Sequence, residues 1–267
     1  MATGNSKMIL IAGAGWGRGL ANTLRGELKG WFATHRWWRQ ILIWTAAVNL
    51  IYLIVAASTP AEQTRFDTTL LLFNIFMGLT GPIGVSIVMQ STVVGEKRAG
   101  TAAWVLSKPV SRAAFILSKL IAHTTGIAAT LVLAQGIIAY LITFIFLKTA
   151  MPVPGFLAGL CVHLANILFY LTLTLMLGVF FEHPGPVIGI PMAVLFAQNI
   201  LMSFYPPLAA FVPWTLAIPV SNEQFPSIAM NLMTGATIPS FMPLYTALTA
   251  SVLFVVIALL VFEKQEL

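Results

Sequence analysis

The stretch TTLLLFNIFMGLTGPIGVSIVMQSTVVG at residues 68–95 holds no Asp, Glu, Lys or Arg, and the loop EKRAGTAAWVLSKPVSR follows it at residues 96–112. A bilayer core about 30 Å thick needs roughly 20 helical residues, so the first stretch is long enough to cross it as one helix. The loop is too polar to span a membrane and too apolar to be a simple linker. Together they predict a spanning helix that ends in a structured loop outside the bilayer.

Five further stretches also lack these four residue types, which brings the predicted number of spans to six. We place the spans near residues 40–58, 68–90, 117–147, 156–181, 186–204 and 243–262. Hydrophobic residues make up 58% of the chain and charged residues only 8%, whereas a soluble domain carries about 25% charged residues. We therefore expect an all-α integral membrane protein that forms one transmembrane domain over residues 1–267.

Lysine and arginine are distributed unevenly between the two sides of these spans. Positive residues favour the cytoplasmic side of a membrane, so we expect both termini in the cytoplasm. Two cations then lie outside, Arg65 and Lys148, and twelve lie inside, namely Lys7, Arg18, Arg25, Lys29, Arg36, Arg39, Lys97, Arg98, Lys108, Arg112, Lys119 and Lys264. This bias predicts a multi-pass protein of the cytoplasmic (inner) membrane, and it accounts for the net charge of +6 without a nucleic-acid partner.

Residues 1–39 are predicted to form a cytoplasmic lead-in and an amphipathic helix before the first span. On a helical wheel, the apolar and aromatic residues of the stretch 18–38 fall within a sector of about 80°, opposite four cations. The sector holds Leu20, Leu24, Leu28, Trp31, His35 and Trp38, and the cations are Arg18, Arg25, Lys29 and Arg36. This pattern is typical of a helix lying in the membrane interface, although a helix packed on protein would share it. Glu27 is the exception, because it borders the apolar sector.

Residues 205–242 lie between the fifth and sixth predicted spans, outside the cell. They hold six prolines yet stay rich in Phe, Leu, Ile and Met. Repeated prolines disfavour an uninterrupted helix. We expect short helices or a re-entrant element here and no seventh span.

Several functional motifs are absent from the chain. It has no Gly-Lys dipeptide, so it lacks a Walker A loop and cannot hydrolyse ATP alone. It has no H-E-x-x-H motif, and its four histidines lack the spacing of metal ligands. No predicted span has an Asp or Glu at its centre, which argues against a proton- or sodium-coupled transporter. We expect no catalytic, cofactor or metal site in this chain.

The cytoplasmic loop at residues 91–116 is predicted to contain a short projecting helix. The second span runs out through Glu96 and breaks near Gly100, after which the short helix begins. Pro109 stops that helix, and Ser111 is a suitable N-cap for the long third helix. The simpler interpretation is a positively charged topogenic loop with a helix cap.

This loop resembles the corresponding loop of permease subunits in type-2 ABC transporters, particularly the NosY-like group. Their pattern reads roughly E-x-x-x-G-T-x-x-x-L-L-S-x-P-V-S-R, with a lysine several residues later. The chain matches it at Glu96, Gly100, Thr101, Leu106, Ser107, Pro109, Val110, Ser111, Arg112 and Lys119, and has Val105 in place of the first leucine. The resemblance extends over the whole chain and implies a fold like that of type V ABC exporters.

The resemblance also implies a function. The chain would be a permease subunit that exports an apolar or amphipathic substrate, as a homodimer or with a sister permease. Two separate ABC ATPase subunits would bind ATP and magnesium. The residues coupled to the ATPase would be Glu96, Arg98, Gly100, Thr101, Trp104, Leu106, Pro109 and Arg112, and the amphipathic helix would be a connecting helix that carries Arg25, Glu27, Leu28 and Trp31.

A translocation path would be lined by one face of the second span and one face of the fifth. These faces carry Asn74, Gly78 and Gly81, and Met192, Phe196 and Asn199, respectively. Close helix packing also accounts for such stripes of small and polar residues.

Two other functions fit the same sequence. One is an accessory or maturation permease, as in the NosY-like group, whose outside segment serves an extracytoplasmic partner. The other is a membrane scaffold that transports nothing and does not move with nucleotide.

Overall fold

The computed structural model describes residues 15–58, 63–220 and 227–265, and every element in them is helical. Six helical stretches are long and apolar enough to cross a membrane: Arg36–Ser58, Phe66–Arg98, Arg112–Leu147, Val153–Phe180, Pro184–Phe204 and Met242–Lys264. These stretches confirm the six predicted spans and a multi-pass membrane protein. Residues 1–14 of the predicted lead-in, and 221–226 of the predicted outside segment, lie outside the described residues.

The first and third spans are interrupted by π-helical turns, whereas the helices of the other four spans are α-helical. The first comprises α2 (Arg36–Trp44), a π-helical turn (Thr45–Asn49) and α3 (Leu50–Ser58). The third comprises α7 (Arg112–Ile127), α8 (Ala134–Ile142) and two π-helical turns (Ala128–Leu133 and Thr143–Leu147). The others are α4 (Gln63–Met89), α9 (Val153–Phe180), α10 (Pro184–Phe204) and α13 (Met242–Lys264).

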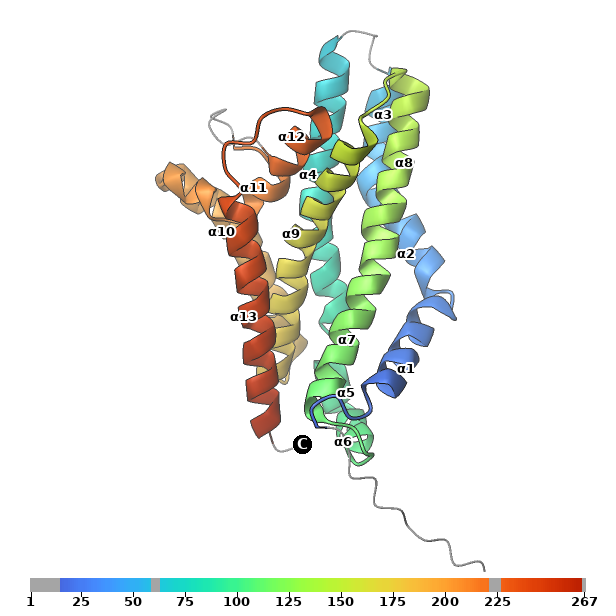
Figure 1. Cartoon of the computed structure of the whole chain (residues 1–267), viewed down its shortest axis with the longest axis vertical. Coiled ribbons are helices and arrows are strands. Elements are labelled where there is room, and N and C mark those ends of the chain that lie inside the picture. Colours follow the sequence, from blue (N-terminus) through green and yellow to red (C-terminus); the bar gives the residue numbers. More distant parts are fainter. Residues whose placement is uncertain (1–14, 59–62, 221–226, 266–267) are drawn as a thin grey trace, which may run out of the picture.

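The fourth span, α9, is the central helix of the bundle. It packs against α4, α12 (Ile228–Thr234) and α13, and most of its side chains are buried. In Figure 1 it runs between the red α13 and the green α7. By contrast, α10 and α13 lie at the periphery and expose many large apolar side chains, as expected of helices that face lipid.

The two ends of the bundle differ (Figure 1). One end carries α5 (Val94–Arg98) and α6 (Thr101–Leu106), beside α1 (Leu20–Phe32) and the C-terminal end of α13. We call residues 94–111 the knuckle and this end the knuckle end. The opposite end carries α12 with η4 (Pro206–Ala210) and α11 (Trp214–Ala217), which form a cap.

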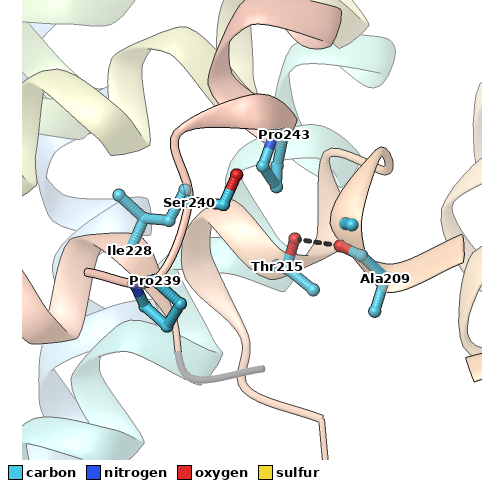
Figure 2. Close-up of a pocket in the computed structure, with 7 residues that line it drawn as sticks. Ala209, Thr215, Ile228, Pro239, Ser240 and Pro243 are labelled. Atoms are coloured by element: carbon cyan, nitrogen blue, oxygen red, sulfur yellow. Dashed lines mark hydrogen bonds between the residues drawn. The ribbon is translucent and has the colours of Figure 1, made fainter. Parts of the chain in front are cut away.

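The cap is closely packed. Figure 2 shows its pocket, a space of about 50 Å³ to which Ala209, Thr215, Ile228 and Pro243 contribute. The hydroxyl of Thr215 donates to the carbonyl of Ala209 across it, at 2.9 Å. Such a space holds a few waters at most, so it is too small for an organic ligand.

A polar network joins the first and third spans in the interior of the bundle. The side-chain oxygen of Gln135 accepts hydrogen bonds from Asn49 at 2.8 Å and from Thr45 at 3.1 Å. Further along both spans, the hydroxyls of Tyr52 and Thr143 are hydrogen-bonded. Thr45, Asn49 and Thr143 all lie in π-helical turns, which displace side chains from regular helical positions. Because no water competes in hydrocarbon, these bonds fix the first span against the third.

The predicted helix at 18–38 is not continuous, and this is a correction. α1 ends at Phe32 and α2 begins at Arg36. The hydroxyl of Thr34 accepts from the backbone N–H of Arg36, the first residue of α2, at 3.3 Å across the turn between the two helices. α1 packs on α7, whereas α2 turns to join the bundle as the first span (Figure 1), and one straight helix cannot follow both directions.

The first span also packs closely against the second. The ring of Trp44 covers Gly84 of α4, and a Cβ on Gly84 would lie 2.0 Å from the nearest ring carbon. The ring and one helix would have to move apart to accommodate it. Only a glycine therefore permits this approach of the two helices.

We expect Gly84→Ala to lower the free energy of unfolding by about 1–3 kcal/mol, because the added methyl overpacks the Trp44 contact. Gly26→Ala in α1 is the matched control. A Cβ at Gly26 meets nothing within 4 Å, so this variant should be unchanged or slightly more stable. Unfolding of both variants in detergent micelles checks this. Equal midpoints for the two variants would contradict the packing described.

Candidate functional site

The knuckle is a tight helical excursion between the second and third spans. α5 follows α4 after one turn, Gly100 separates α5 from α6, and residues 107–111 return the chain to α7. Gly100 adopts a left-handed backbone with φ 69°, a conformation that costs other residues roughly 1–2 kcal/mol. The predicted break near Gly100 is therefore present. Ser111 is the N-cap of α7 as predicted, since its hydroxyl accepts from the N–H of Ala114 at 3.0 Å.

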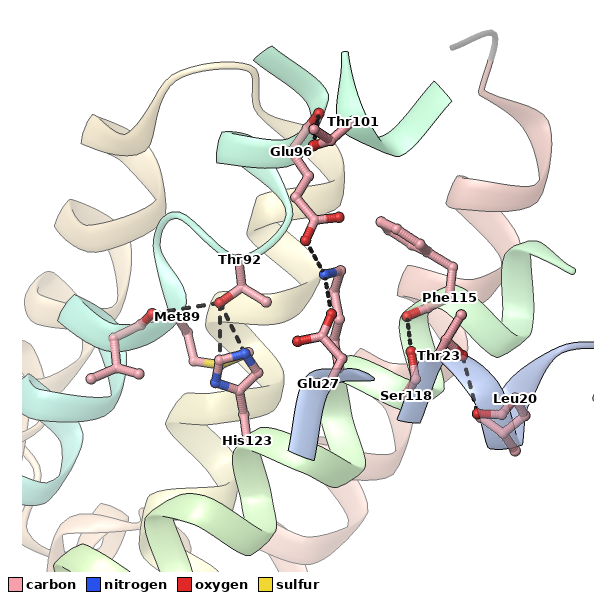
Figure 3. Close-up of polar contacts among 12 residues, drawn as sticks. Leu20, Thr23, Glu27, Met89, Thr92, Glu96, Thr101, Phe115, Ser118 and His123 are labelled. Atoms are coloured by element: carbon pink, nitrogen blue, oxygen red, sulfur yellow. Dashed lines mark hydrogen bonds and ion pairs between the residues drawn. The ribbon is translucent and has the colours of Figure 1, made fainter. Parts of the chain in front are cut away.

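A buried lysine anchors the knuckle to two other helices. Lys119 of α7 is 1% exposed. Its ammonium donates to Glu27 of α1 at 2.7 Å and to Glu96 of α5 at 2.5 Å. Figure 3 shows both carboxylates directed to this point from separate helices. The ammonium also lies 4.7 Å from the ring centre of Phe115. We call Glu27, Lys119 and Glu96 the triad.

The triad explains the position of Glu27 beside the apolar sector of α1. That sector faces the bundle, where Leu24 and Leu28 pack on the core and Trp31 is buried. Trp31 lies edge-on to His123 and covers Gly126 of α7. Glu27 needs to be on the same side to reach Lys119. The predicted connecting-helix residues Glu27, Leu28 and Trp31 are thus brought together against α7, and Arg25 points away from them, exposed.

Positive side chains of the same region satisfy the C-terminal ends of two spans. Arg112 donates to the carbonyls of Phe262 and Glu263, at 3.0 and 2.8 Å, and thereby caps α13. Lys97 donates to the carbonyl of Val179 near the end of α9, at 2.9 Å. Cations are favourable at helix C-termini, where unpaired carbonyls carry partial negative charge. The start of α7 and the knuckle are therefore tied to the ends of α9 and α13.

The chain before α1 is attached to the return turn of the knuckle. The N–H of Ser111 donates to the carbonyl of Arg18 at 2.9 Å, and its hydroxyl donates to the carbonyl of Trp16. Gly19 has φ 82°, and a Cβ there would lie 2.9 Å from Val110. A left-handed glycine thus lets this segment lie directly on the turn. The knuckle is held from both sides, by this segment and by the triad.

The predicted coupling residues divide into an inner and an outer group. Glu96 and Arg112 point inward to the contacts above, and Leu106 packs partly against the core. The outer group is exposed, namely Arg98, Gly100, Thr101, Trp104 and Pro109. Trp104 is 63% exposed, with the ammonium of Lys108 4.9 Å from its ring centre. The outward surface of the knuckle therefore carries an exposed indole with the ammonium of Lys108 beside it, and the exposed Arg98.

The two predicted lining stripes do not share a surface within this chain. Asn74 is buried and bonded to His163 at 2.9 Å, while Gly78 and Gly81 lie against Ile218 and Ile167. The three predicted lining residues of α10 are accessible: Met192 is half-buried, and Phe196 and Asn199 are exposed. The α4 stripe thus serves close packing in this conformation, and the role of both stripes in transport stays a prediction.

Sequence reasoning did not single out Gln198, which is the inward-facing amide of α10. Its nitrogen donates to the hydroxyl of Tyr170 at 2.7 Å, and its oxygen accepts from the N–H of Trp214 at 2.9 Å. It ties α10 to α9 and α11. The neighbouring Asn199 was assigned to the path because it aligns with Met192 and Phe196, and alignment alone does not show which face points inward.

Comparison with known proteins adds one finding. A family model described as "Protein of unknown function (DUF2705)" matches residues 36–267. No protein of curated function matches the chain. The matched region begins at the first residue of α2, so it contains all six spans and the knuckle but not α1.

We expect the double variant Glu27→Gln/Glu96→Gln to lose about 3–5 kcal/mol of unfolding free energy, because it leaves a buried ammonium without a counter-charge. Lys119→Met should cost less, since the side chains of Glu27 and Glu96 are 27% and 32% exposed and can bind water. Each single Glu→Gln variant retains one carboxylate and should lose about 1 kcal/mol.

Denaturant unfolding of the four variants in the same detergent measures these differences. The double variant should lose more unfolding free energy than Lys119→Met, and this ranking is the result that tests the triad. If Lys119→Met were as destabilising as the double variant, an unpaired buried charge would not be the source of the double variant's loss.

Proposed function

The chain belongs to the DUF2705 family, and we propose that it is the permease subunit of an ATP-driven exporter whose ATPase is a separate chain. The observation that carries the proposal is the knuckle, which projects from two spans and is braced from inside. Its sequence resembles the pattern of the coupling loop in type-2 ABC permeases, except at Val105. The chain has no Walker A loop, so an ATP-driven role requires a second protein.

The outward surface of the knuckle suits a docking helix. Trp104 projects from α6 with Lys108 over its ring, and Arg98 at the end of α5 is also exposed. Tryptophan and arginine are the residue types that contribute most to protein interfaces. A short helix of this kind could insert its exposed indole into a groove of an ATPase, while its cations pair with acidic residues at the rim of that groove. The knuckle end would then face the cytoplasm, as the distribution of cations predicts.

The bracing of the knuckle supports transmission of movement. ATP-driven closure of two ATPases would draw two knuckles together. Because the triad joins the knuckle to α1 and α7, those helices would move with it. The first span would follow the third through the contacts of Gln135 with Thr45 and Asn49. Rigid elements that share one anchor convert a local displacement into movement of the spans.

Two copies of the chain, or one copy and a sister permease, would be needed for two ATPases. The exposed face of α10 is suited to that contact. Gly185, Gly189 and Ala193 recur there every four residues and are exposed, followed by Phe196 and Asn199. The side chain of Asn199 has no hydrogen-bond partner in the part of the chain that the structure describes. An amide on a spanning helix gains most from a partner on another helix. An apolar or amphipathic substrate would pass beside this face.

We expect Trp104→Ala to weaken binding of the cognate ABC ATPase at least about 30-fold, the equivalent of about 2 kcal/mol for loss of a central anchor. Trp37→Ala is the control, because Trp37 is also exposed but lies on α2. Pull-down and titration of the ATPase with the purified full-length variants measure the effect. A complex unaffected by Trp104→Ala, or absent for the wild-type chain, would overturn the permease proposal and favour a scaffold.

A cysteine at position 199 should form a disulfide between two copies in oxidised membranes, in a Cys161→Ser background. The control is Val252→Cys, since Val252 is 62% exposed on the face of another peripheral span, α13. Nonreducing gel electrophoresis measures the dimer fraction. Crosslinking at 252 without crosslinking at 199 would contradict dimerisation through α10.

A further inference from the structure

The outward side of α1 is a basic surface that the bundle leaves free. α1 buries Trp31 against α7, and Leu24 and Leu28 are half-buried at the edge of that contact. Arg25 and Lys29, one helical turn apart, are exposed. In the part of the chain that the structure describes, neither side chain has an ion pair or a hydrogen bond. The two cations are therefore available to a ligand.

No carboxylate in this region is left to neutralise them. The segment 15–44 has five cations and one acid, Glu27, which is bound to Lys119. Arg36 is turned inward, with its guanidinium 4.4 Å from the ring centre of Trp31. α7, on which α1 packs, contributes only Arg112 and Lys119 as charged residues. The outward side of α1 is therefore a concentrated positive field.

The same surface has an apolar part. A shallow depression of about 610 Å³ lies along α1, and Arg25 and Lys29 line it together with Leu24, Leu28 and Phe32. Phe32 is 42% exposed. One side of a ligand in this depression would meet two cations, and the other would meet hydrocarbon side chains. Those are the requirements of an amphiphile with an anionic head.

The position of α1 relative to the bilayer identifies the source of such an amphiphile. After three residues α1 leads into α2, the start of the first span, where Trp37 and Trp38 are exposed at 42% and 40%. Exposed tryptophans at the start of a span are typical of the headgroup region. α1 therefore lies where phospholipid headgroups are.

We propose that the outward side of α1 binds an anionic phospholipid, with the phosphate between Arg25 and Lys29 and an acyl chain along Leu24, Leu28 and Phe32. Because α1 packs only part of its apolar sector on α7, it faces the membrane with two cations, one aromatic ring and the free edges of two leucines. Anionic lipids attract each such cation. The bound lipid would steady the helix that supplies Glu27 to the triad. This lipid site does not depend on the proposed transport function.

The test is titration of the full-length chain in detergent with phosphatidylglycerol or phosphatidylcholine, with bound lipid counted by native mass spectrometry. Arg25→Gln/Lys29→Gln should weaken phosphatidylglycerol binding about 30-fold, since each cation contributes ~1 kcal/mol near an anionic headgroup. Arg18→Gln/Arg39→Gln removes the same charge from exposed positions in the same segment and should weaken it less than about threefold. Phosphatidylcholine should bind weakly to all three proteins.

The charge-preserving variant Arg25→Lys/Lys29→Arg should retain binding, and it controls for misfolding of α1. Phosphatidylglycerol with a photoreactive acyl chain should label residues 21–33 of the wild-type chain. Equal weakening by the two glutamine pairs would overturn the site, because it would indicate only a diffuse field. Wild-type binding of phosphatidylcholine as tight as that of phosphatidylglycerol, or labelling confined to other segments, would also overturn it.

Discussion

The ammonium of Lys119 is buried at the knuckle end, and two carboxylates from different helices meet it there. A buried charge without a partner costs several kcal/mol, so this lysine favours conformations in which Glu27 and Glu96 stay beside it. These two ion pairs hold both α1 and α5 at Lys119 of α7. The orientation of the knuckle and the start of the first span both follow from them.

The same end of the bundle is closed by the cations that cap α9 and α13, Lys97 and Arg112. Through these contacts and the triad, the knuckle and the start of α7 are connected to α1, α9 and α13. Polar contacts between the first and third spans extend this continuity along the bundle, through side chains in π-helical turns. A displacement of α6 would therefore be transmitted to the spans. A permease driven by a separate ATPase requires such transmission.

The spans were predictable because length and the absence of charge define them, and Gly100 and Ser111 were predictable because their signals are local. The sequence marked Lys119 only as a cytoplasmic cation and as the lysine that follows the loop pattern. Nothing in its neighbourhood indicated that Glu27, 92 positions earlier, would meet it. Gln135 was missed for a related reason. A single amide in an apolar stretch gives no sign of which helix it faces, and packing decides that.

The most direct test of the account is a distance measurement within one chain. Spin labels at Asn22 and Ala103, both exposed, would report on α1 and α6 in a Cys161→Ser background, which removes the one native cysteine. If Lys119 holds α1 and α6 in place, the wild-type sequence gives a single narrow distance distribution and Lys119→Met gives a broad one. A distribution that stays equally narrow in Lys119→Met would show that the buried lysine does not hold these helices together.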